Sequence, residues 1–189
     1  MTKGDNFIDI GANIGSLTVL GAGIVGEKGK VISIEPHPRI FKFLEGNIKF
    51  NKLKNIKSYN VAVGESKGVL SFEDQSSDDQ NKISVKSSSG LKVDVDLLDN
   101  LTTTIEKFKL LKIDVEGFEL FVLKGAKNTL RKTEIVYFES WEKHFNNFDY
   151  STGDVIKLLN DYGFKVFKDK KEIDTNYISE KCENLVARR

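Results

Sequence analysis

The strongest constraint on the fold is a pair of short apolar runs that each end at a turn. Residues 6–10 and residues 30–34 are strand-length and rich in β-branched side chains, and they end at Gly11 and at Glu35. The segment between them carries apolar residues at rough helical spacing, which predicts a helix. A strand, a crossover helix and a parallel strand form the repeating unit of α/β sheets, so the chain is predicted to begin with a parallel sheet.

The alternation of strand and helix continues along the chain. Five further strands are predicted, at residues 57–63, 110–114, 134–138, 164–167 and 184–187. Three further helices are predicted, one after Pro38, one over residues 116–131 and one over residues 154–162. We expect a single domain over residues 1–189 with a doubly wound, three-layer, mostly parallel sheet, in which the two terminal strands pair antiparallel.

Residues 64–100 interrupt this alternation. They show no helical period, only short alternating apolar pieces, and predict a β excursion after the third strand. Its tip, residues 71–89, is rich in Ser, Asp, Gln and Lys. The tip fits a solvated loop, and it also fits a lid that faces the substrate.

Composition argues against several kinds of partner, cross-link, metal site and cellular location. The 29 basic and 28 acidic side chains leave a net charge of +1, too balanced for a domain that grips nucleic acid. The single cysteine, Cys182, excludes a disulfide framework and a cysteine-built zinc site, and we expect no metal site. No run approaches the ~20 apolar residues of a membrane span, and the first residues do not resemble a signal peptide. We therefore expect a cytoplasmic protein.

The turn after the first run is where a ligand is expected, because open α/β sheets bind ligands beyond the carboxyl ends of their strands. Gly11 and Gly15 allow a tight turn, and Asn13 tolerates a left-handed backbone. Glu35 follows Gly11 by 24 residues, roughly where an acidic residue accepts ribose hydroxyls in dinucleotide sites. Together with Asp9, these residues favour a ligand that contains adenosine.

A nicotinamide cofactor fits this turn poorly, because its fingerprint needs glycines where Asn13 and Ser16 stand. Residues 21–26 match that fingerprint, but only three residues separate them from the next strand. That spacing leaves no helix to receive a pyrophosphate. A ligand without a pyrophosphate needs fewer glycines, which points to S-adenosyl-L-methionine.

Four segments, in their order and spacing, closely resemble the FkbM-type methyltransferases: residues 7–15, 35–36, 60–62 and 111–119. The resemblance runs from about residue 5 to residue 138. It implies the seven-stranded class I methyltransferase (Rossmann-like) fold. It also implies O-methylation, the transfer of a methyl group from S-adenosyl-L-methionine to a hydroxyl of a sugar, glycan or secondary metabolite. Members of the family usually carry more chain before the first strand, so we expect a minimal or truncated version.

The resemblance assigns the cofactor to the ends of the first three strands. The methionine end falls to Asp9, Gly11, Asn13 and Gly15, the ribose hydroxyls to Glu35, and the adenine edge to Asn60, Val61 and Ala62. Pro36, directly after Glu35, is also expected to bind the cofactor. The chemistry of these residues agrees, because an acid suits a cationic amino group and a carboxylate accepts two hydroxyl hydrogens.

Three residues on the acceptor side are catalytic candidates: Asp114, Glu139 and His144. Asp114 ends a strand that lies beside the first strand in this topology, so its carboxylate is expected in the same crevice as Gly11. A buried carboxylate there suits the removal of the hydroxyl proton or the orientation of the acceptor. The alternative role of Asp114 is a contact with the cofactor or the helix start.

Several residues near these candidates fit either a structural or a functional role. Trp141 offers a stacking surface for a sugar, or packs. His144 and His37 also fit ordinary surface histidines. Glu116, three residues before Glu119, suits the amino terminus of the following helix.

Other enzyme classes lack their expected residues. An amino-directed nucleic-acid methyltransferase needs two adjacent prolines after the fourth strand, but Pro36 and Pro38 are the only prolines. A cytosine-carbon enzyme needs a crevice cysteine, and Cys182 lies near the carboxyl end. A metal-dependent catechol-type enzyme favours an Asp-Asn pair where Glu139-Ser140 stands. The open alternatives are a cofactor-binding module without catalysis and a nicotinamide-dependent oxidoreductase.

Overall fold

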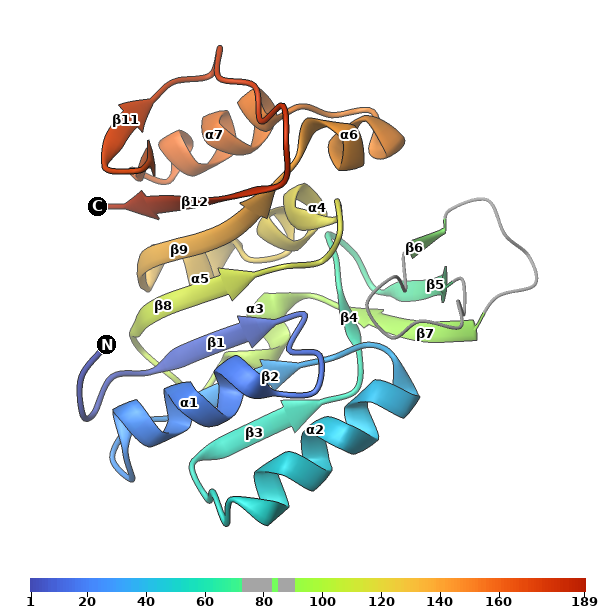
Figure 1. Ribbon diagram of the computed structural model, residues 1–189, viewed down its shortest axis with the longest axis vertical. Coiled ribbons are helices and arrows are strands. Elements are labelled where there is room, and N and C mark those ends of the chain that lie inside the picture. The colour runs from blue at the N-terminus through green and yellow to red at the C-terminus, as the bar shows by residue number, and fades with distance from the viewer. Residues whose placement is uncertain (73–82, 85–90) are drawn as a thin grey trace.

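The computed structural model describes residues 1–72, 83–84 and 91–189. Its main sheet has eight strands: β1 (Phe7–Ile10), β2 (Val31–Ile34), β3 (Ile56–Tyr59), β8 (Phe108–Ile113), β9 (Thr133–Ser140), β10 (Lys165–Lys168), β11 (Lys171–Ile173) and β12 (Glu183–Arg188). Their order is β11-β10-β12-β9-β8-β1-β2-β3 (Figure 1). The neighbours from β3 to β9 pair in parallel, and β12 is antiparallel to both β9 and β10. This confirms the predicted sheet and its terminal pair, to which β11 adds an unpredicted edge strand.

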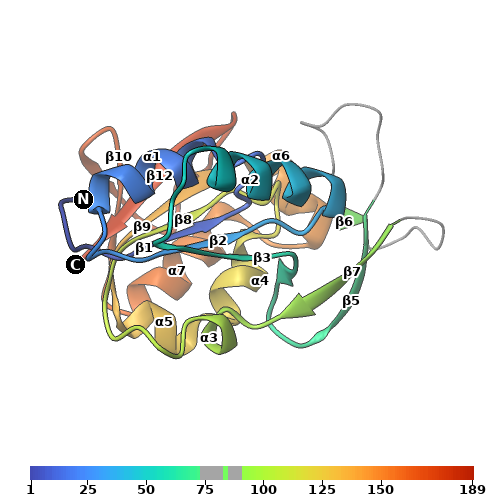
Figure 2. The same cartoon turned by 90° about the horizontal axis from the view of Figure 1, so that it is seen from below.

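Helices cover both faces of the sheet. The longer ones are α1 (Ser16–Val25), α2 (Pro38–Phe50), α4 (Glu119–Lys124), α5 (Lys127–Arg131) and α7 (Thr152–Asp161). Short turns of helix are α3 (Leu98–Leu101), α6 (Glu142–Phe145) and η1 (Asn146–Phe148). Figure 2 shows α1 and α2 on one side of the sheet, and α4, α5 and α7 on the other. The three layers are therefore as predicted.

The core explains why the first two strands, β1 and β2, are mostly apolar. All four residues of β1 are buried. Successive strand residues point to opposite faces, so Ile8 and Ile10 join the larger core while Phe7 packs with Ala22 and Val25 of α1. A strand that is covered on both faces has little room for polar residues on either face. A near-continuous apolar run, without alternation, is therefore the pattern of a buried parallel strand.

A second, smaller sheet stands beyond the carboxyl ends of the parallel strands (Figure 1). Its strands are β4 (Ala62–Val63), β5 (Gly68–Phe72), β6 (Ile83–Ser84) and β7 (Leu91–Asp96), in the order β4-β7-β5-β6. This confirms the predicted β excursion. The expectation that residues 71–89 form a solvated loop or a lid falls mostly outside the described residues.

The prediction of one strand over residues 57–63 is wrong. The strand β3 ends at Tyr59, because the side-chain amide of Asn60 donates to the carbonyls of Glu35 and Pro36, at 2.9 and 2.8 Å. The chain then leaves the main sheet, and Ala62 pairs in parallel with β7.

The prediction of one helix over residues 116–131 is also wrong. Glu116 and Gly117 have left-handed backbones, with φ of +55° and +100°, so helix α4 begins only after this turn. The helical segment then breaks at Gly125, where a Cβ atom would lie 2.0 Å from the Gly64 carbonyl oxygen. The break lets the second sheet pack close to the segment between α4 and α5.

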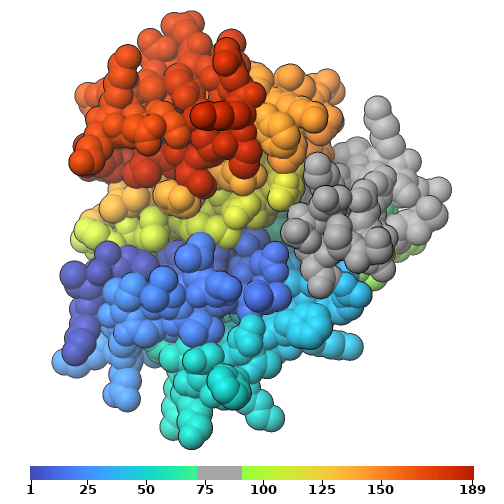
Figure 3. Space-filling model, viewed as in Figure 1, coloured from blue at the N-terminus to red at the C-terminus, as the bar shows by residue number. Residues whose placement is uncertain are grey.

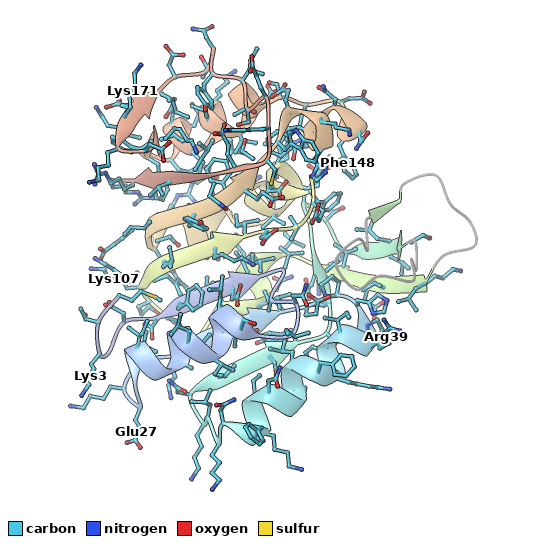
Figure 4. The ribbon with its side chains drawn as sticks, in the orientation of Figure 1. Lys3, Glu27, Arg39, Lys107, Phe148 and Lys171 are labelled. Carbon is cyan, nitrogen blue, oxygen red and sulfur yellow. The ribbon has the colours of Figure 1, made fainter. Side chains whose placement is uncertain are left out.

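The N-terminal and C-terminal parts of the chain lie towards opposite ends of the long axis of the molecule. Figure 3 shows the N-terminal part of the chain (blue to cyan) and the C-terminal part (orange to red) at opposite ends of that axis, with β8 and β9 between them. None of the helices that these residues form is long and apolar enough to cross a membrane. In Figure 4, Arg39 and Phe148 mark the carboxyl edge of the sheet, and Lys3 and Lys107 mark the opposite edge.

Candidate active site

The turn between β1 and α1 is as tight as its glycines predict. Gly11 has φ of +70°, and a Cβ atom there would lie 1.8 Å from the backbone oxygen of Asp114. Asn13 adopts the predicted left-handed conformation, with φ of +51°. Gly15, with φ of +91°, forms the N-cap of α1. These positions bring the backbone at the end of β1 against the end of β8.

Glu35 joins this turn to the turn that follows β2. Its Oε2 accepts a hydrogen bond from the amide of Asn13, and its Oε1 accepts one from the amide of His37, both at 2.9 Å. Burial raises the pKa of Glu35, and the two backbone donors oppose that rise. Each carboxylate oxygen has a second acceptor position. The side chain is therefore positioned between two turns and can accept further hydrogen bonds.

The residues predicted at the adenine edge lie beside Glu35. Both amide hydrogens of Asn60 go to the carbonyls beyond β2, which fixes the end of β3 next to that of β2. Val61 is half-buried against the core, and Ala62 is 4% exposed in β4. Their contact with an adenine stays a prediction.

Lys112, for which no role was predicted, contacts the first turn from the neighbouring strand β8. Its ammonium donates to the Gly11 carbonyl at 2.8 Å and lies 3.2 Å from Asp9 Oδ1 and 3.5 Å from Asp114 Oδ2. The side chain is only 7% exposed. A lysine inside an otherwise apolar buried strand is rare unless it is paired, and that pattern in residues 110–113 was the signal that could have identified it.

Asp9 differs from its predicted role as a direct ligand of the methionine end. Its side chain is fully buried; Oδ1 faces Lys112, and Oδ2 accepts a hydrogen bond of 2.6 Å from Thr18. Thr18 also lies 2.8 Å from the Ser33 hydroxyl. Because its side chain is fully buried, Asp9 contacts the surroundings of the turn through Lys112 and α1.

Asp114 lies where it was predicted, directly after β8 and beside the first turn. Its backbone amide donates to the Ile10 carbonyl at 3.2 Å. The expectation of burial is wrong, however, because its side chain is 44% exposed. The carboxylate is therefore accessible at the carboxyl edge while it remains close to the Lys112 ammonium.

Glu139 and His144, both predicted on the acceptor side, come together with Glu116. One ligating atom from each of the three side chains lies within 4.8 Å of the other two, and Glu116 Oε2 is 3.4 Å from His144 Nδ1. Burial raises the pKa of Glu139, the Cys182 thiol that donates to it opposes the rise, and Asp114 adds to it. Burial and the hydrogen bond to Glu139 raise the pKa of the Cys182 thiol to about 12, so this thiol is not a nucleophile near neutral pH.

The two histidines are not surface residues. His144 packs against Trp141, with 4.3 Å between ring centroids, and is 6% exposed. This contact gives Trp141 a packing role; a stacked sugar stays a prediction. His37 is 4% exposed and caps α2, where its Nδ1 accepts a hydrogen bond from the Arg39 amide at 3.3 Å.

Glu119 braces the turn that carries Glu116. It is 1% exposed, and its Oε1 accepts a hydrogen bond from the Val115 amide at 3.1 Å. Its Oε2 lies 3.4 Å from the Tyr150 hydroxyl, which donates to the Gly117 carbonyl at 2.7 Å. Burial raises the pKa of Glu119 to about 8. A protonated Glu119 completes this network, because the single hydrogen of Tyr150 is already used on Gly117.

Two curated proteins resemble parts of the chain. Hexuronic acid methyltransferase AglP from Haloferax volcanii is 31% identical over 135 residues, which are 69% of this chain and 54% of that protein. A probable cobalt-precorrin-6B C(15)-methyltransferase from Sulfolobus acidocaldarius is 36% identical over 67 residues, or 35% of this chain and 33% of that protein. The chain thus spans about a third to about half the length of these relatives.

The fold is that of solved class I methyltransferases. A putative methyltransferase from Streptococcus mutans in complex with SAH (S-adenosylhomocysteine) has a TM-score of 0.57 at 9% identity, and the match covers 100% of this chain and 90% of that chain. The family model of the methyltransferase FkbM domain matches residues 9–166. This match covers most of the chain, so the protein belongs to the FkbM methyltransferase family.

Proposed function

We propose that the protein transfers a methyl group from S-adenosyl-L-methionine to a hydroxyl of a sugar, a glycan or a secondary metabolite. One observation carries this proposal: two carboxylates, Glu35 and Asp114, flank the same left-handed turn at the carboxyl edge of the sheet. Glu35 has acceptor positions for a ligand, and Asp114 is exposed beside the turn.

The residues around the first turn suit the cofactor. A Cβ atom at Gly11 would overlap the backbone at Asp114, so only a glycine fits there and the turn lies tightly against the end of β8. The spare acceptor positions of Glu35 suit the two ribose hydroxyls. Asn60, Val61 and Ala62 lie on the adenine side. Asp9 contributes indirectly, because it holds Lys112 and α1 against the turn.

The protein must align the acceptor and remove one proton. The sulfonium group of the bound cofactor supplies an already activated methyl group. An in-line approach of the acceptor oxygen then depends on positioning, and a carboxylate near that oxygen takes the proton. We assign this base role to Asp114, because it is exposed while Lys112 fixes its position at 3.5 Å.

A sugar hydroxyl is the acceptor that we favour. The curated relative AglP is named a hexuronic acid methyltransferase, and Trp141 lies close to the acceptor side through its contact with His144. The net charge of +1 does not favour nucleic acid. We place the reaction in the cytoplasm, since the single cysteine needs no oxidising compartment.

Transfer of a labelled methyl group tests this function. The protein is incubated with methyl-labelled S-adenosyl-L-methionine and, separately, with a hexuronic acid glycan, a mixed glycan pool and a metabolite extract. Label in a glycan at an ether oxygen is the expected result. Calorimetry with S-adenosylhomocysteine and NADH runs in parallel. Binding of NADH alone would favour the oxidoreductase, and S-adenosylhomocysteine binding without transfer to any pool would favour the module without catalysis.

A further inference from the structure

We propose that Glu116, Glu139 and His144 bind a first-row divalent transition metal ion on the acceptor side of the crevice. The three residues come from different segments: the turn after β8, the end of β9 and helix α6. Their ligating atoms all lie within 4.8 Å of one another. Metal–ligand bonds of about 2.1 Å place two ligand atoms roughly 3.0 to 4.2 Å apart. Small side-chain adjustments therefore bring all three onto one ion.

The fold holds the ligands in place before an ion arrives. The His144 side chain is 8% exposed and packs on Trp141. A Cβ atom at Gly117 would lie 2.9 Å from the backbone oxygen of His144, so the turn that carries Glu116 is closed tightly onto α6. Glu116 itself has a left-handed backbone, with φ of +55°, which is costly for this residue type. Glu116 Oε2 is thereby held 3.4 Å from the imidazole.

The charges at this place favour a cation. A third carboxylate, that of Asp114, adds negative charge to that of Glu116 and Glu139, and it repels the charge on Glu139. The ammonium of Lys112 is shared between Asp114 and the fully buried Asp9, so it balances at most part of this negative charge. A divalent ion supplies the missing positive charge at the point where the carboxylates meet.

The donor set indicates the kind of ion. Two carboxylates and one imidazole combine the oxygen ligands preferred by Mg²⁺ and Mn²⁺ with the nitrogen ligand preferred by Zn²⁺, Fe²⁺ and Ni²⁺. A borderline first-row ion satisfies both preferences. These ligands were not recognised from the sequence, because an Asp-Asn pair was sought after β9, whereas the structure assembles its three ligands from separate segments.

Three protein ligands leave coordination positions open for an acceptor oxygen. If the proposed methyl transfer holds, an ion there lowers the pKa of the bound hydroxyl. The O–H proton passes to the Asp114 carboxylate. The acceptor oxygen then supplies the electron pair of the new O–CH₃ bond. The CH₃–S⁺ bond breaks at the same time, and the electron pair of the broken bond stays on sulfur. The metal site itself does not depend on this assignment.

Metal binding by the full chain, without cofactor or acceptor, tests the proposal. Chelator-treated protein is titrated with Mn²⁺, and free Mn²⁺ is followed by electron paramagnetic resonance, with Zn²⁺ as competitor. We expect one Mn²⁺ per chain, displaced by Zn²⁺, and at least about 10-fold weaker binding in Glu139→Gln and in Glu116→Gln. Glu172→Gln, which changes an exposed acid on β11, should bind as wild type does.

Two results would overturn the metal site. One is no Mn²⁺ binding at about 1 mM, which would leave Glu116 and His144 as a simple ion pair. The other is binding that both ligand variants retain, which would mean adventitious surface binding. Circular dichroism shows whether each variant is folded. If the Glu139 variant does not fold, the variant of the part-exposed Glu116 decides. S-adenosylhomocysteine affinity is measured on the same samples, so a failure of the proposed methyl transfer is distinguishable from a failure of the metal site.

Discussion

The substitution Glu119→Gln should stabilise the protein relative to the wild type, and this advantage should grow as the pH rises. Burial raises the pKa of Glu119 from 4.5 to about 8, so the folded protein holds this proton more tightly than the unfolded chain. The stabilisation from this proton is complete below pH 4.5 and is lost as the pH rises towards 8. Each pH unit in this interval costs the folded state about 1.4 kcal/mol, or about 5 kcal/mol in all.

Glutamine copies the protonated side chain. Its Oε1 can accept from the Val115 amide, and its amide can donate to the Tyr150 oxygen. Urea unfolding of both proteins from pH 5 to pH 9 measures the effect. We expect similar stabilities at pH 5, an advantage of about 3 kcal/mol for the variant at pH 7, and an advantage of about 5 kcal/mol at pH 9. Glu27→Gln is the control, because Glu27 points into solvent (Figure 4). A stability difference that does not change with pH would refute the buried, protonated Glu119.

Three further substitutions test the first turn and the acceptor side. Lys112→Met should lower the unfolding free energy by about 3–5 kcal/mol in urea, because it leaves Asp9 buried without its cation; Lys109→Met on the same strand, whose partner is exposed, should lower it far less. Gly11→Ala should abolish S-adenosylhomocysteine binding or folding, since its Cβ atom would lie 1.8 Å from the Asp114 oxygen; wild-type affinity by calorimetry would contradict the close approach. Asp114→Asn should slow single-turnover methyl transfer ~100-fold to 10,000-fold with little change in cofactor affinity; lost affinity with a normal bound-state rate would instead make Asp114 a cofactor ligand.

The sequence predicted what depends on local pattern. The runs before Gly11 and Glu35 are buried on both faces, so their composition alone identified β1 and β2. The left-handed backbone at Asn13 also followed from residue type. These features depend on a few neighbouring residues, and the sequence contains them in full.

The errors arose where distant segments decide the outcome. The strand β3 ends early because the Asn60 amide binds carbonyls 24 and 25 residues away. The segment after α4 breaks because Gly125 meets Gly64. Lys112 serves the first turn from 101 residues away. A local pattern can mark an unusual residue such as Lys112, but it does not show which distant atoms that residue meets. The exposure of Asp114 was misjudged for the same reason.

The placement of the cofactor at Glu35 is the central claim, and its most direct test is the affinity for S-adenosylhomocysteine. Calorimetry compares the wild-type protein with Glu35→Ala, and circular dichroism confirms that the variant is folded. Loss of a charged acceptor for the ribose should weaken binding by ~1.5–3 kcal/mol, which is about 10-fold to 150-fold. A folded Glu35→Ala protein that binds S-adenosylhomocysteine with unchanged affinity would contradict the account.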